Sequence, residues 1–283
     1  MKKIVSLLLA ILMLAVCCLG GCAKKEAAQA TLTVAISPDF APMEFVDTTK
    51  TGQDQYVGFD VTLAKYIAQE MGRTLVIKPM SFDACQVAVQ TKSVDMSISG
   101  FSVTPERAQN YNLSDYYYAG ENETEQVIIT TKENEGKWTK ADDFAGLTVG
   151  AQTASLQMNL CNEQLPDTVT IKEFGDIGVA VEALRNGNID ALAVAKGNGD
   201  AIIANNDALA FTGFEFVVSE EAENNVILLP KGADELTKQV NEILAKAYAA
   251  GLYGQWYEEA KALAGIETSA EVGYDDQGNV SSD

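Results

Sequence analysis

The sequence predicts an α/β protein made of two lobes with a ligand cleft between them. Strand and helix patterns alternate at a spacing typical of parallel sheets with crossover helices, and they do so in two similar series, residues 32–98 and 126–194. After residue 225 a further strand and a long amphipathic helix follow, which indicates that the chain returns at its end. Ligands bind beyond the carboxyl ends of strands in such sheets, so the cleft is the predicted site.

The first series begins with an apolar strand at Leu32–Ile36, followed by a proline-punctuated loop at Ser37–Phe45 that carries two aromatic residues. A helix is predicted from Asp60, a candidate N-terminal cap, to about Met71, because apolar residues recur at every fourth position and Gly72 follows as a stop signal. The remaining elements of this series are a strand at Leu75–Ile77, a helix at Phe82–Gln90 and a strand at Val94–Ile98.

The second series is interpreted in the same way, from apolar runs bounded by glycine, proline and polar residues. Its predicted strands are Gln126–Thr131, Leu147–Gly150, Thr168–Lys172 and Asp190–Val194, and its predicted helices are Ser155–Asn162 and Ile177–Asn186. The closing elements are a strand at Val226–Leu229 and a helix at Ala233–Ala249.

The stretch Ser99–Arg107 is the first indication of a binding site. It follows the last strand of the first series, and Thr104 followed by Pro105 and Glu106 is typical of a helix start. A guanidinium forms bidentate, charge-assisted bonds to a planar carboxylate, and backbone N–H groups at a helix start add partial positive charge. The stretch therefore predicts a carboxylate site at Arg107; a surface turn whose arginine pairs with a protein acid is the alternative.

Both ends of the chain are predicted to lie outside the fold. Residues 1–21 begin with a basic pair and continue as a short apolar run, which indicates a signal peptide. The run closes with Leu19–Cys22 (LGGC), which is similar to the lipobox of bacterial lipoproteins and implies lipidation of Cys22, with residues 22–30 as a lipidated tether. An ordinary signal peptide that contains cysteine is the alternative. Residues 266–283 are acidic, lack apolar periodicity and are predicted to be a disordered tail.

Composition narrows the class of function. The chain has 20 basic and 40 acidic residues, and this negative balance argues against nucleic acid or anionic lipid as a partner surface. It has no histidine, which removes Ser-His and Cys-His nucleophile pairs and histidine metal sites. Cys85 and Cys161 lie beyond the leader in different predicted lobes, so we expect free, buried thiols.

Several ordered motifs resemble those of the polar amino-acid solute-binding proteins of ABC importers, the bacterial extracellular solute-binding protein family 3. These motifs are Val57–Val61, Ser99–Arg107, Leu113–Tyr117, Leu228–Gly232 and Gly254–Tyr257. The resemblance implies the two-lobed periplasmic-binding-protein fold of type II. It also implies a first lobe at 31–117 plus 225–265, a second lobe at 121–220, and two hinge strands that let the lobes close around a ligand.

The resemblance implies roles for individual residues of the first lobe. Arg107 matches the arginine that holds the ligand α-carboxylate, Ser102 matches the hydroxyl beside it, and Gly100 matches the backbone group that meets the ligand's amino end. Phe40 and Phe82 match aromatic residues that sandwich the ligand side chain. Ordinary core packing is the alternative for these two rings.

In the second lobe, Gln152 and Ser155 fall where the family adds polar contacts to the ligand. Polar residues at a helix start also serve as caps, which is the alternative for both. Ala154 stands where the family usually has glycine.

The main departure from the family comes at the end of the strand that begins at Asp190. The family places there an aspartate that pairs with the ligand ammonium group, but this chain has Ala195, followed by Lys196. A buried ammonium without a counter-charge is costly. Either another acid supplies the charge or the ligand is not a standard α-amino acid, and Lys196 is either a partner for a second anionic group or a solvated rim residue. The candidate acids are Asp39, Glu44 and Asp200.

These observations predict a lipid-anchored substrate-binding component of an ABC transporter, which captures an amino acid or related small carboxylate and delivers it to a membrane permease. We expect a monomer without catalytic activity, metal ion, cofactor or nucleic-acid partner. It would be exported and held to the outer face of the bacterial cell membrane by its lipid anchor only. The alternatives are an exported enzyme of the dehydratase type on the same fold, which would need an acid or base in the cleft, and a ligand-sensing ectodomain.

Overall fold

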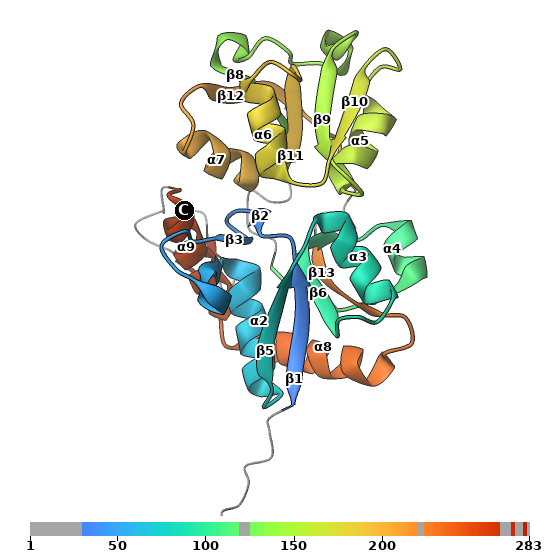
Figure 1. The fold of residues 1–283 in the computed structure, drawn as a ribbon, viewed down its shortest axis with the longest axis vertical. Coiled ribbons are helices and arrows are strands. Elements are labelled where there is room, and N and C mark those ends of the chain that lie inside the picture. Colours follow the sequence, from blue (N-terminus) through green and yellow to red (C-terminus); the bar gives the residue numbers. More distant parts are fainter. Residues whose placement is uncertain (1–29, 119–124, 220–223, 267–272, 275–279, 282–283) are drawn as a thin grey trace, which may run out of the picture. The chain divides into compact units, whose positions relative to one another are not determined.

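The computed structural model describes residues 30–118, 125–219, 224–266, 273–274 and 280–281. All of these except Ala30 belong to one compact unit, Thr31–Asp283. This unit contains two five-stranded sheets with helices packed against them (Figure 1). The predictions of a signal peptide, of lipidation at Cys22 and of the tether up to residue 29 concern residues outside this description. The two predicted lobe crossings also fall largely outside it, at 119–124 and 220–223.

The sheet of the first lobe has the strand order β5-β1-β6-β13-β7. Strand β1 (Thr31–Ile36) lies parallel to both β5 (Thr74–Pro79) and β6 (Met96–Ser102). Strand β13 (Asn225–Pro230) lies antiparallel to β6 and to β7 (Tyr111–Leu113). The chain therefore returns to this sheet near its end, as predicted.

Helices cover both faces of the first sheet, so its strands are apolar on both sides. Alternate residues of β13 pack in different cores: Ile227 contacts one cluster and Leu228 the other. The helices on one face are α2 (Phe59–Glu70), α8 (Asp234–Ala249) and α9 (Leu252–Ala264), and the helix on the other is α3 (Phe82–Gln90). The short helix α4 (Pro105–Asn110) follows β6.

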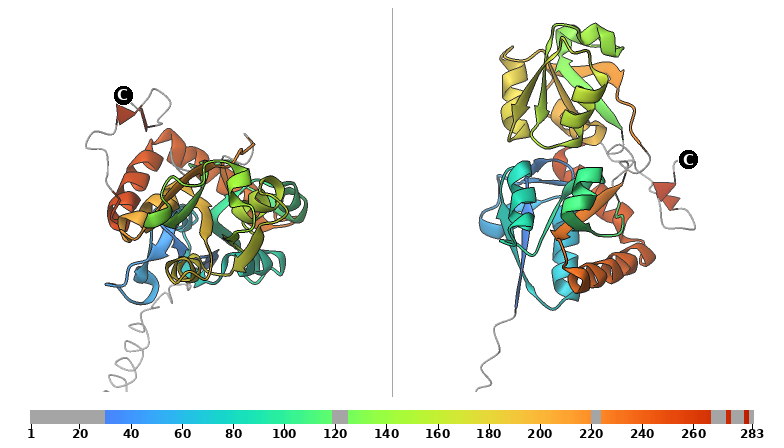
Figure 2. Two further views of the ribbon diagram at one scale, coloured as in Figure 1. Left: turned by 90° about the horizontal axis from the view of Figure 1, so that it is seen from above. Right: turned by 90° about the vertical axis from the view of Figure 1, so that its right-hand side faces the viewer.

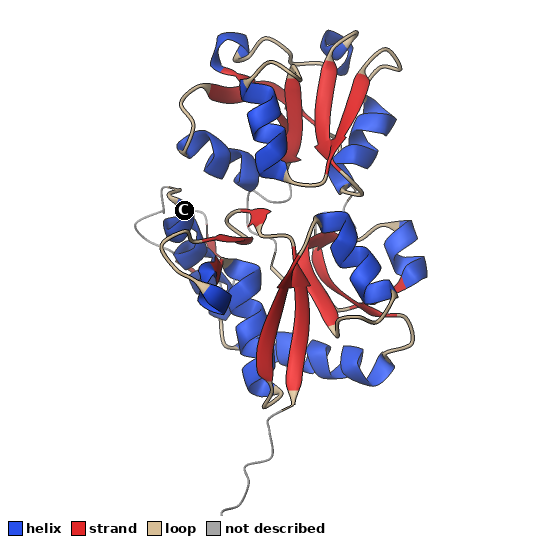
Figure 3. Cartoon of the chain, viewed as in Figure 1, coloured by secondary structure: helices blue, strands red, loops and turns tan. Residues whose placement is uncertain are grey.

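The sheet of the second lobe repeats this arrangement with the order β10-β9-β11-β8-β12. Strand β9 (Thr148–Gln152) is parallel to β10 (Thr170–Phe174) and β11 (Ala191–Ala195). Strand β8 (Gln126–Thr131) is antiparallel to β11 and to β12 (Leu209–Glu215). Figure 3 shows helices in blue beside the strands of each sheet.

Helix α5 (Leu156–Gln164) packs on one face of the second sheet, and α6 (Ile177–Arg185) and α7 (Lys196–Ala204) pack on the other. The remaining elements are short. They are the three-stranded sheet β2 (Asp39–Phe40), β3 (Glu44–Val46) and β4 (Tyr56–Val57), and the 3₁₀ turns η1 (Gly52–Gln55), η2 (Lys132–Asn134) and η3 (Ala141–Phe144).

The strands of the first predicted series, β1, β5 and β6, are parallel as expected, and each main sheet also contains antiparallel strands that the pattern did not predict. Register gives the reason: the first residue of β8, Gln126, lies opposite the last residue of β11, Ala195. Likewise the first residue of β13, Asn225, lies opposite the last residue of β6, Ser102. A strand that begins at the edge where its neighbour ends must run antiparallel to it.

Other differences are local. The predicted loop at Ser37–Phe45 contains β2 and the start of β3, and Asp60 does not cap α2, because Gly58 holds that position and the Asp60 side chain is fully buried. In the predicted tail, β14 (Gly273–Tyr274) pairs with β15 (Val280–Ser281), a contact between two-residue strands that needs no apolar periodicity. Cys85 and Cys161 are free and buried, as predicted.

Figure 2 shows the two sheets from two further directions. Within the part of the chain that the structure describes, no helix combines the length and the apolar character needed to cross a membrane.

Candidate ligand-binding site

A small cavity lies where the two lobes meet, at the carboxyl ends of β6, β9 and β11. Its volume is about 30 Å³, far below the roughly 300 Å³ or more of pockets that hold small molecules, so a ligand enters only when contacts around it separate. All seven residues predicted to bind the ligand line it: Phe40, Phe82, Gly100, Ser102, Arg107, Gln152 and Ser155. The other lining residues are Leu156, Gln157, Ile177, Ala193, Val194 and Ala195.

Arg107 is held at the start of α4. Thr104 caps this helix, because its hydroxyl oxygen accepts from the Arg107 N–H at 3.2 Å. The guanidinium donates from Nη1 to the Ser102 carbonyl at 2.8 Å and from Nη2 to the Ala154 carbonyl at 3.0 Å. Its Nε donates more weakly to Gln86 Oε1 at 3.4 Å. The side chain therefore contacts both lobes through neutral acceptors.

Arg107 is buried, with 4% of its surface exposed. Burial lowers its pKa to about 10, so the guanidinium stays cationic at neutral pH. The rings of Phe82 and Phe101 lie 5.4 and 5.2 Å from its central carbon, and such contacts stabilise a cation. No carboxylate among the described residues forms an ion pair with it. This buried cation is therefore suited to an incoming anion, which disfavours the alternative of a surface turn.

The two aromatic residues predicted to enclose the ligand, Phe40 and Phe82, differ in how they pack. Phe82 stacks on Phe101 with ring centroids 4.8 Å apart, and it is 93% buried, so one face of the ring packs in the core. Phe40 is half-buried and lies against Gly100, where φ is +55° and an added Cβ would sit 2.8 Å from the ring. Glycine is therefore required at position 100 both by its backbone angle and by the close approach of Phe40.

A buried pair of acids lies beneath Gly100, and sequence reasoning missed it. The Gly100 N–H donates to Asp60 Oδ2 at 2.8 Å, and the Tyr117 hydroxyl donates to the same oxygen at 3.0 Å. The Ser99 hydroxyl donates to Glu44 Oε1. Glu44 and Asp60 are both fully buried. The Gly100 N–H is thus occupied by Asp60 and does not face a ligand.

Burial raises the pKa values of both Glu44 and Asp60, and repulsion by Asp60 raises that of Glu44 further. Two carboxylates this close cannot both be ionised at low cost. Glu44 Oε2 and Asp60 Oδ1 have no hydrogen-bond partner among the described residues, and the two carboxyl groups interact with each other. We therefore infer that the pair shares a proton at neutral pH.

Asp39 connects the two lobes. Its Oδ2 accepts from Gln152 Nε2 at 3.0 Å and from the Ile177 N–H, at the start of α6, at 2.8 Å. Its Oδ1 accepts from the Ser37 hydroxyl at 2.9 Å. Burial raises the pKa of Asp39 to about 6. The side chain of Gln152 thus serves the contact between lobes as well as lining the cavity.

Ser155 and Ala154 form the turn between β9 and α5. Ser155 caps α5, because its hydroxyl accepts from the Met158 N–H at 3.1 Å, so the capping alternative holds although the residue also lines the cavity. Ala154 has φ +60°, a conformation in which glycine is favoured. This geometry turns its carbonyl toward Arg107 and Gln86.

The end of β11 is apolar. Ala193, Val194 and Ala195 are 4%, 2% and 2% exposed. Lys196, which follows them, donates to both oxygens of Asp200 at 2.6 and 2.7 Å and lies 4.6 Å from the ring centroid of Phe211. Neither Lys196 nor Asp200 lines the cavity, so the two charges pair with each other.

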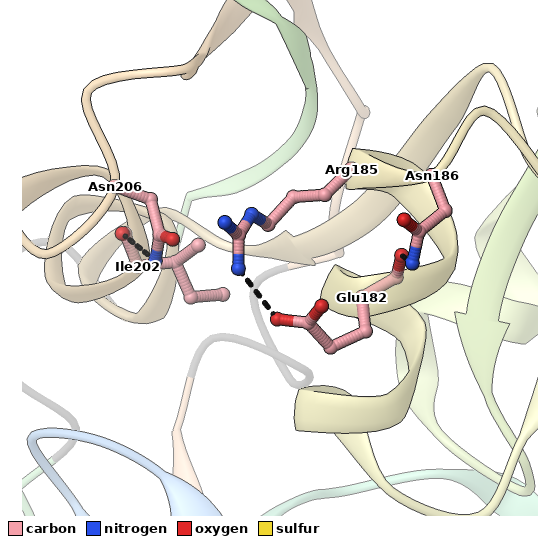
Figure 4. Close-up of polar contacts among 5 residues, drawn as sticks. All are labelled: Glu182, Arg185, Asn186, Ile202 and Asn206. Carbon is pink, nitrogen blue, oxygen red and sulfur yellow. Dashed lines mark hydrogen bonds and ion pairs between the residues drawn. The ribbon is translucent and has the colours of Figure 1, made fainter.

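A separate surface depression of about 490 Å³ lies on the second lobe. Figure 4 shows its Arg185, which donates to Glu182 Oε1 at 2.7 Å, beside Asn186, which donates to the Glu182 carbonyl at 2.8 Å. Both partners of the ion pair are about half exposed, and such pairs contribute little. No group of His, Cys, Asp or Glu within the described ranges could hold a metal ion.

The fold and the cleft define a two-lobed binding protein, and comparison with known proteins gives its family. Residues 32–260 match the bacterial extracellular solute-binding proteins, family 3, and the chain belongs to this family. It is 29% identical over 220 residues to the arginine-binding extracellular protein ArtP of Bacillus subtilis, a match that covers 77% of this chain and 81% of that protein. It is 28% identical over 228 residues to a probable histidine-binding protein of Campylobacter jejuni, covering 77% and 84%.

A solved structure gives the same result. The amino acid ABC transporter substrate-binding protein AbpA of Streptococcus pneumoniae, bound to L-arginine, superposes with a TM-score of 0.76 at 29% identity. The match covers 84% of this chain and 97% of that one. The predicted two-lobed fold is therefore confirmed.

Proposed function

We propose that this protein is the lipid-anchored substrate-binding component of an ABC transporter, and that it captures an amino acid or related small carboxylate and delivers it to a membrane permease. The observation that carries this proposal is Arg107, a buried cation at the cavity wall whose described partners are all neutral. The relatives named as an arginine-binding protein and a probable histidine-binding protein support the class of solute. Catalysis is not part of the proposal.

In the proposed complex, Arg107 and Ser102 hold the ligand carboxylate and the Gly100 carbonyl accepts from a donor on the ligand. Phe40 and the exposed edge of Phe82 enclose its side chain. Gln152 and Ser155 contribute neutral polar contacts from the second lobe. The lobes correspond to 31–117 plus 225–265 and to 121–220, and they close by rotation about the two crossings.

The first test is a thermal-shift screen of the full chain in detergent against amino acids, their derivatives, dicarboxylates and small peptides. A ligand that binds the folded state raises the unfolding midpoint by mass action. The compound that gives the largest shift should be recovered unchanged after incubation, whereas a converted compound would support an enzyme. If no carboxylate shifts the midpoint, the proposed function is wrong.

The anchor has its own test. Mass spectrometry of the protein from membranes should find a diacylglycerol-modified Cys22 at the mature N-terminus. In Cys22→Ser the protein should leave the membrane fraction, whereas ligand binding should not change. An unmodified N-terminus at another residue would favour an ordinary signal peptide.

A further inference from the structure

The described residues that line the cavity carry a positive charge and no negative one. Arg107 is the one ionisable side chain among the described residues that line it. A ligand carboxylate at Arg107 would neutralise this charge. A positive group on the same ligand would then need its own partner on the cavity wall, because a buried charge without one is strongly unfavourable.

The carboxylate of Asp39, which contacts two residues of the cavity wall, is hydrogen-bonded within the protein. Asp39 is bonded on Oδ1 by the Ser37 hydroxyl and on Oδ2 by two donors from the second lobe, Gln152 Nε2 and the Ile177 N–H. Both donors belong to residues that line the cavity. With the lobes together, as in this structure, Asp39 is therefore bonded to these wall residues and does not itself line the cavity.

The other candidate acids, Glu44 and Asp200, and Asp60 beside Glu44 are also hydrogen-bonded within the protein. Both oxygens of Asp200 accept from Lys196 Nζ. Glu44 and Asp60 are fully buried beneath Gly100, where Ser99, Gly100 and Tyr117 donate to them. None of these three carboxylates lines the cavity.

The part of the cavity wall that the second lobe contributes carries no charged side chain among the described residues. The buried end of β11 presents Ala193, Val194 and Ala195, which offer only aliphatic side chains. The polar side chains on the second-lobe wall are Gln152, Ser155 and Gln157, which are amides and a hydroxyl. Neutral amide and hydroxyl groups of a ligand can exchange hydrogen bonds with these side chains, whereas an ammonium group would lose its hydration without gaining a counter-charge.

We propose that the ligand is a small carboxylate without a free ammonium group in the cleft, in the class of N-acylated amino acids and 2-hydroxy acids. This inference rests on the proposed function, because it takes Arg107 as the partner of the carboxylate. What the inference adds concerns the group next to that carboxylate, which is a neutral donor or acceptor in place of an ammonium group.

Matched ligand series test the inference. The full chain in detergent is titrated calorimetrically with the standard L-amino acids and, for each side chain, with the N-acetyl derivative and the 2-hydroxy acid. In the series that binds, a ligand without the ammonium group should bind at least about 100-fold more tightly than the free amino acid. A free amino acid that binds more tightly than both counterparts would overturn the inference and leave carboxylate capture intact. Absence of binding in every series would overturn the inference and the proposed function together.

A variant at the end of β11 gives an independent readout. Ala195→Asp introduces a carboxylate beside the cavity, and Ala195→Asn is the matched neutral control. We expect Ala195→Asp to bind the free amino acid of that series at least about 10-fold more tightly than Ala195→Asn. Equal affinities in two folded variants would contradict the inference. If Ala195→Asp does not unfold cooperatively, the ligand series on the unmodified chain decide the question.

Discussion

Arg107 and the Glu44–Asp60 pair are both buried charged groups of the first lobe, but the protein stabilises them differently. The two acids lie beneath Gly100 and are fully buried. They accept hydrogen bonds from Ser99, Gly100 and Tyr117. A shared proton removes one of their two charges. Arg107 keeps its charge, and its described partners are two carbonyls, an amide and two aromatic rings.

The difference distinguishes a structural site from the proposed binding site. The acid pair is neutralised as far as possible within the protein, so it holds the Gly100 backbone without attracting an ion. Arg107 is hydrogen-bonded but not neutralised, so its remaining electrostatic attraction is available to a ligand. Under the proposed function, Arg107 is distinguished from the acid pair by its missing counter-charge, because both are buried and hydrogen-bonded.

The largest expected effect comes from removing the unneutralised charge. Arg107→Met should weaken binding of the carboxylate ligand by about 2–5 kcal/mol, because a buried charge-assisted contact is lost. The free energy of unfolding should stay the same or rise, since a buried cation is costly to the folded state. Calorimetric titration and urea unfolding measure the two quantities, with Arg107→Lys as the control that retains charge but loses the forked geometry. Unchanged affinity in Arg107→Met would remove the carboxylate site.

The opposite pattern, a loss of stability, is expected for changes at the buried acids beneath Gly100. Asp60→Ala removes the acceptor of both the Gly100 N–H and the Tyr117 hydroxyl, and should lower the free energy of unfolding by about 2–4 kcal/mol. Tyr117→Phe removes one donor and leaves the other bond in place, so it should cost only about 1 kcal/mol. Urea unfolding gives both values. Similar losses in the two variants would mean that Asp60 does not hold Gly100.

The shared proton predicts a dependence on pH. Because the folded-state pKa of Glu44 lies above its usual value of 4.5, the folded protein retains a proton that the unfolded chain releases. The contribution of Glu44 to stability should therefore be fully present below this value and be lost as pH rises toward the folded-state pKa. Glu44→Gln has no proton to release at this position, so its free energy of unfolding should fall less over this rise in pH than that of the unmodified protein.

This comparison removes the contribution of Asp39, whose raised pKa of about 6 acts in the same direction in both proteins. Urea unfolding at several pH values measures the difference. Parallel pH profiles would show that Glu44 does not titrate differently in the folded and unfolded states.

The smallest effect concerns the backbone that faces Arg107. Ala154 occupies a left-handed conformation that costs a non-glycine residue about 1–2 kcal/mol, whereas glycine loses about 0.5–1 kcal/mol of flexibility on folding. Ala154→Gly should therefore raise the free energy of unfolding by at most about 1 kcal/mol, measured by urea unfolding. A clear loss of stability would mean that the Ala154 methyl group makes a contact worth more than the strain.

Local pattern predicted most elements of the fold. The helix at Phe82–Gln90 and the strand at Gln126–Thr131 have the predicted bounds, because each is a short apolar pattern with clear polar boundaries. Helix α7 was missed because Gly197 and Gly199 lower its intrinsic helix propensity. The structure supplies the reason for Gly199: an added Cβ would lie 2.8 Å from the Phe211 ring, so tertiary packing requires glycine there.

The sequence predicted which residues meet at the candidate site but not which partners they contact there. The seven predicted residues meet at one cavity, since the motifs that carry them occur at strand ends. The pairing of Glu44 with Asp60 and the contact of Asp39 with Ile177 were not predicted. These partners are 16 and 138 residues apart in sequence, and no local pattern reports a contact made only when separate elements pack.

The bonds of Asp39 have a kinetic consequence. They join the lobes through protein atoms alone, so they oppose opening of the cleft whatever its contents. A solute that arrives must wait for Asp39 to release Gln152 and the start of α6. The observed association rate should then level off at high solute concentration, at the frequency of opening. Asp39 would limit the rate at which the cleft opens to solutes, whereas Arg107 would determine which solutes stay bound.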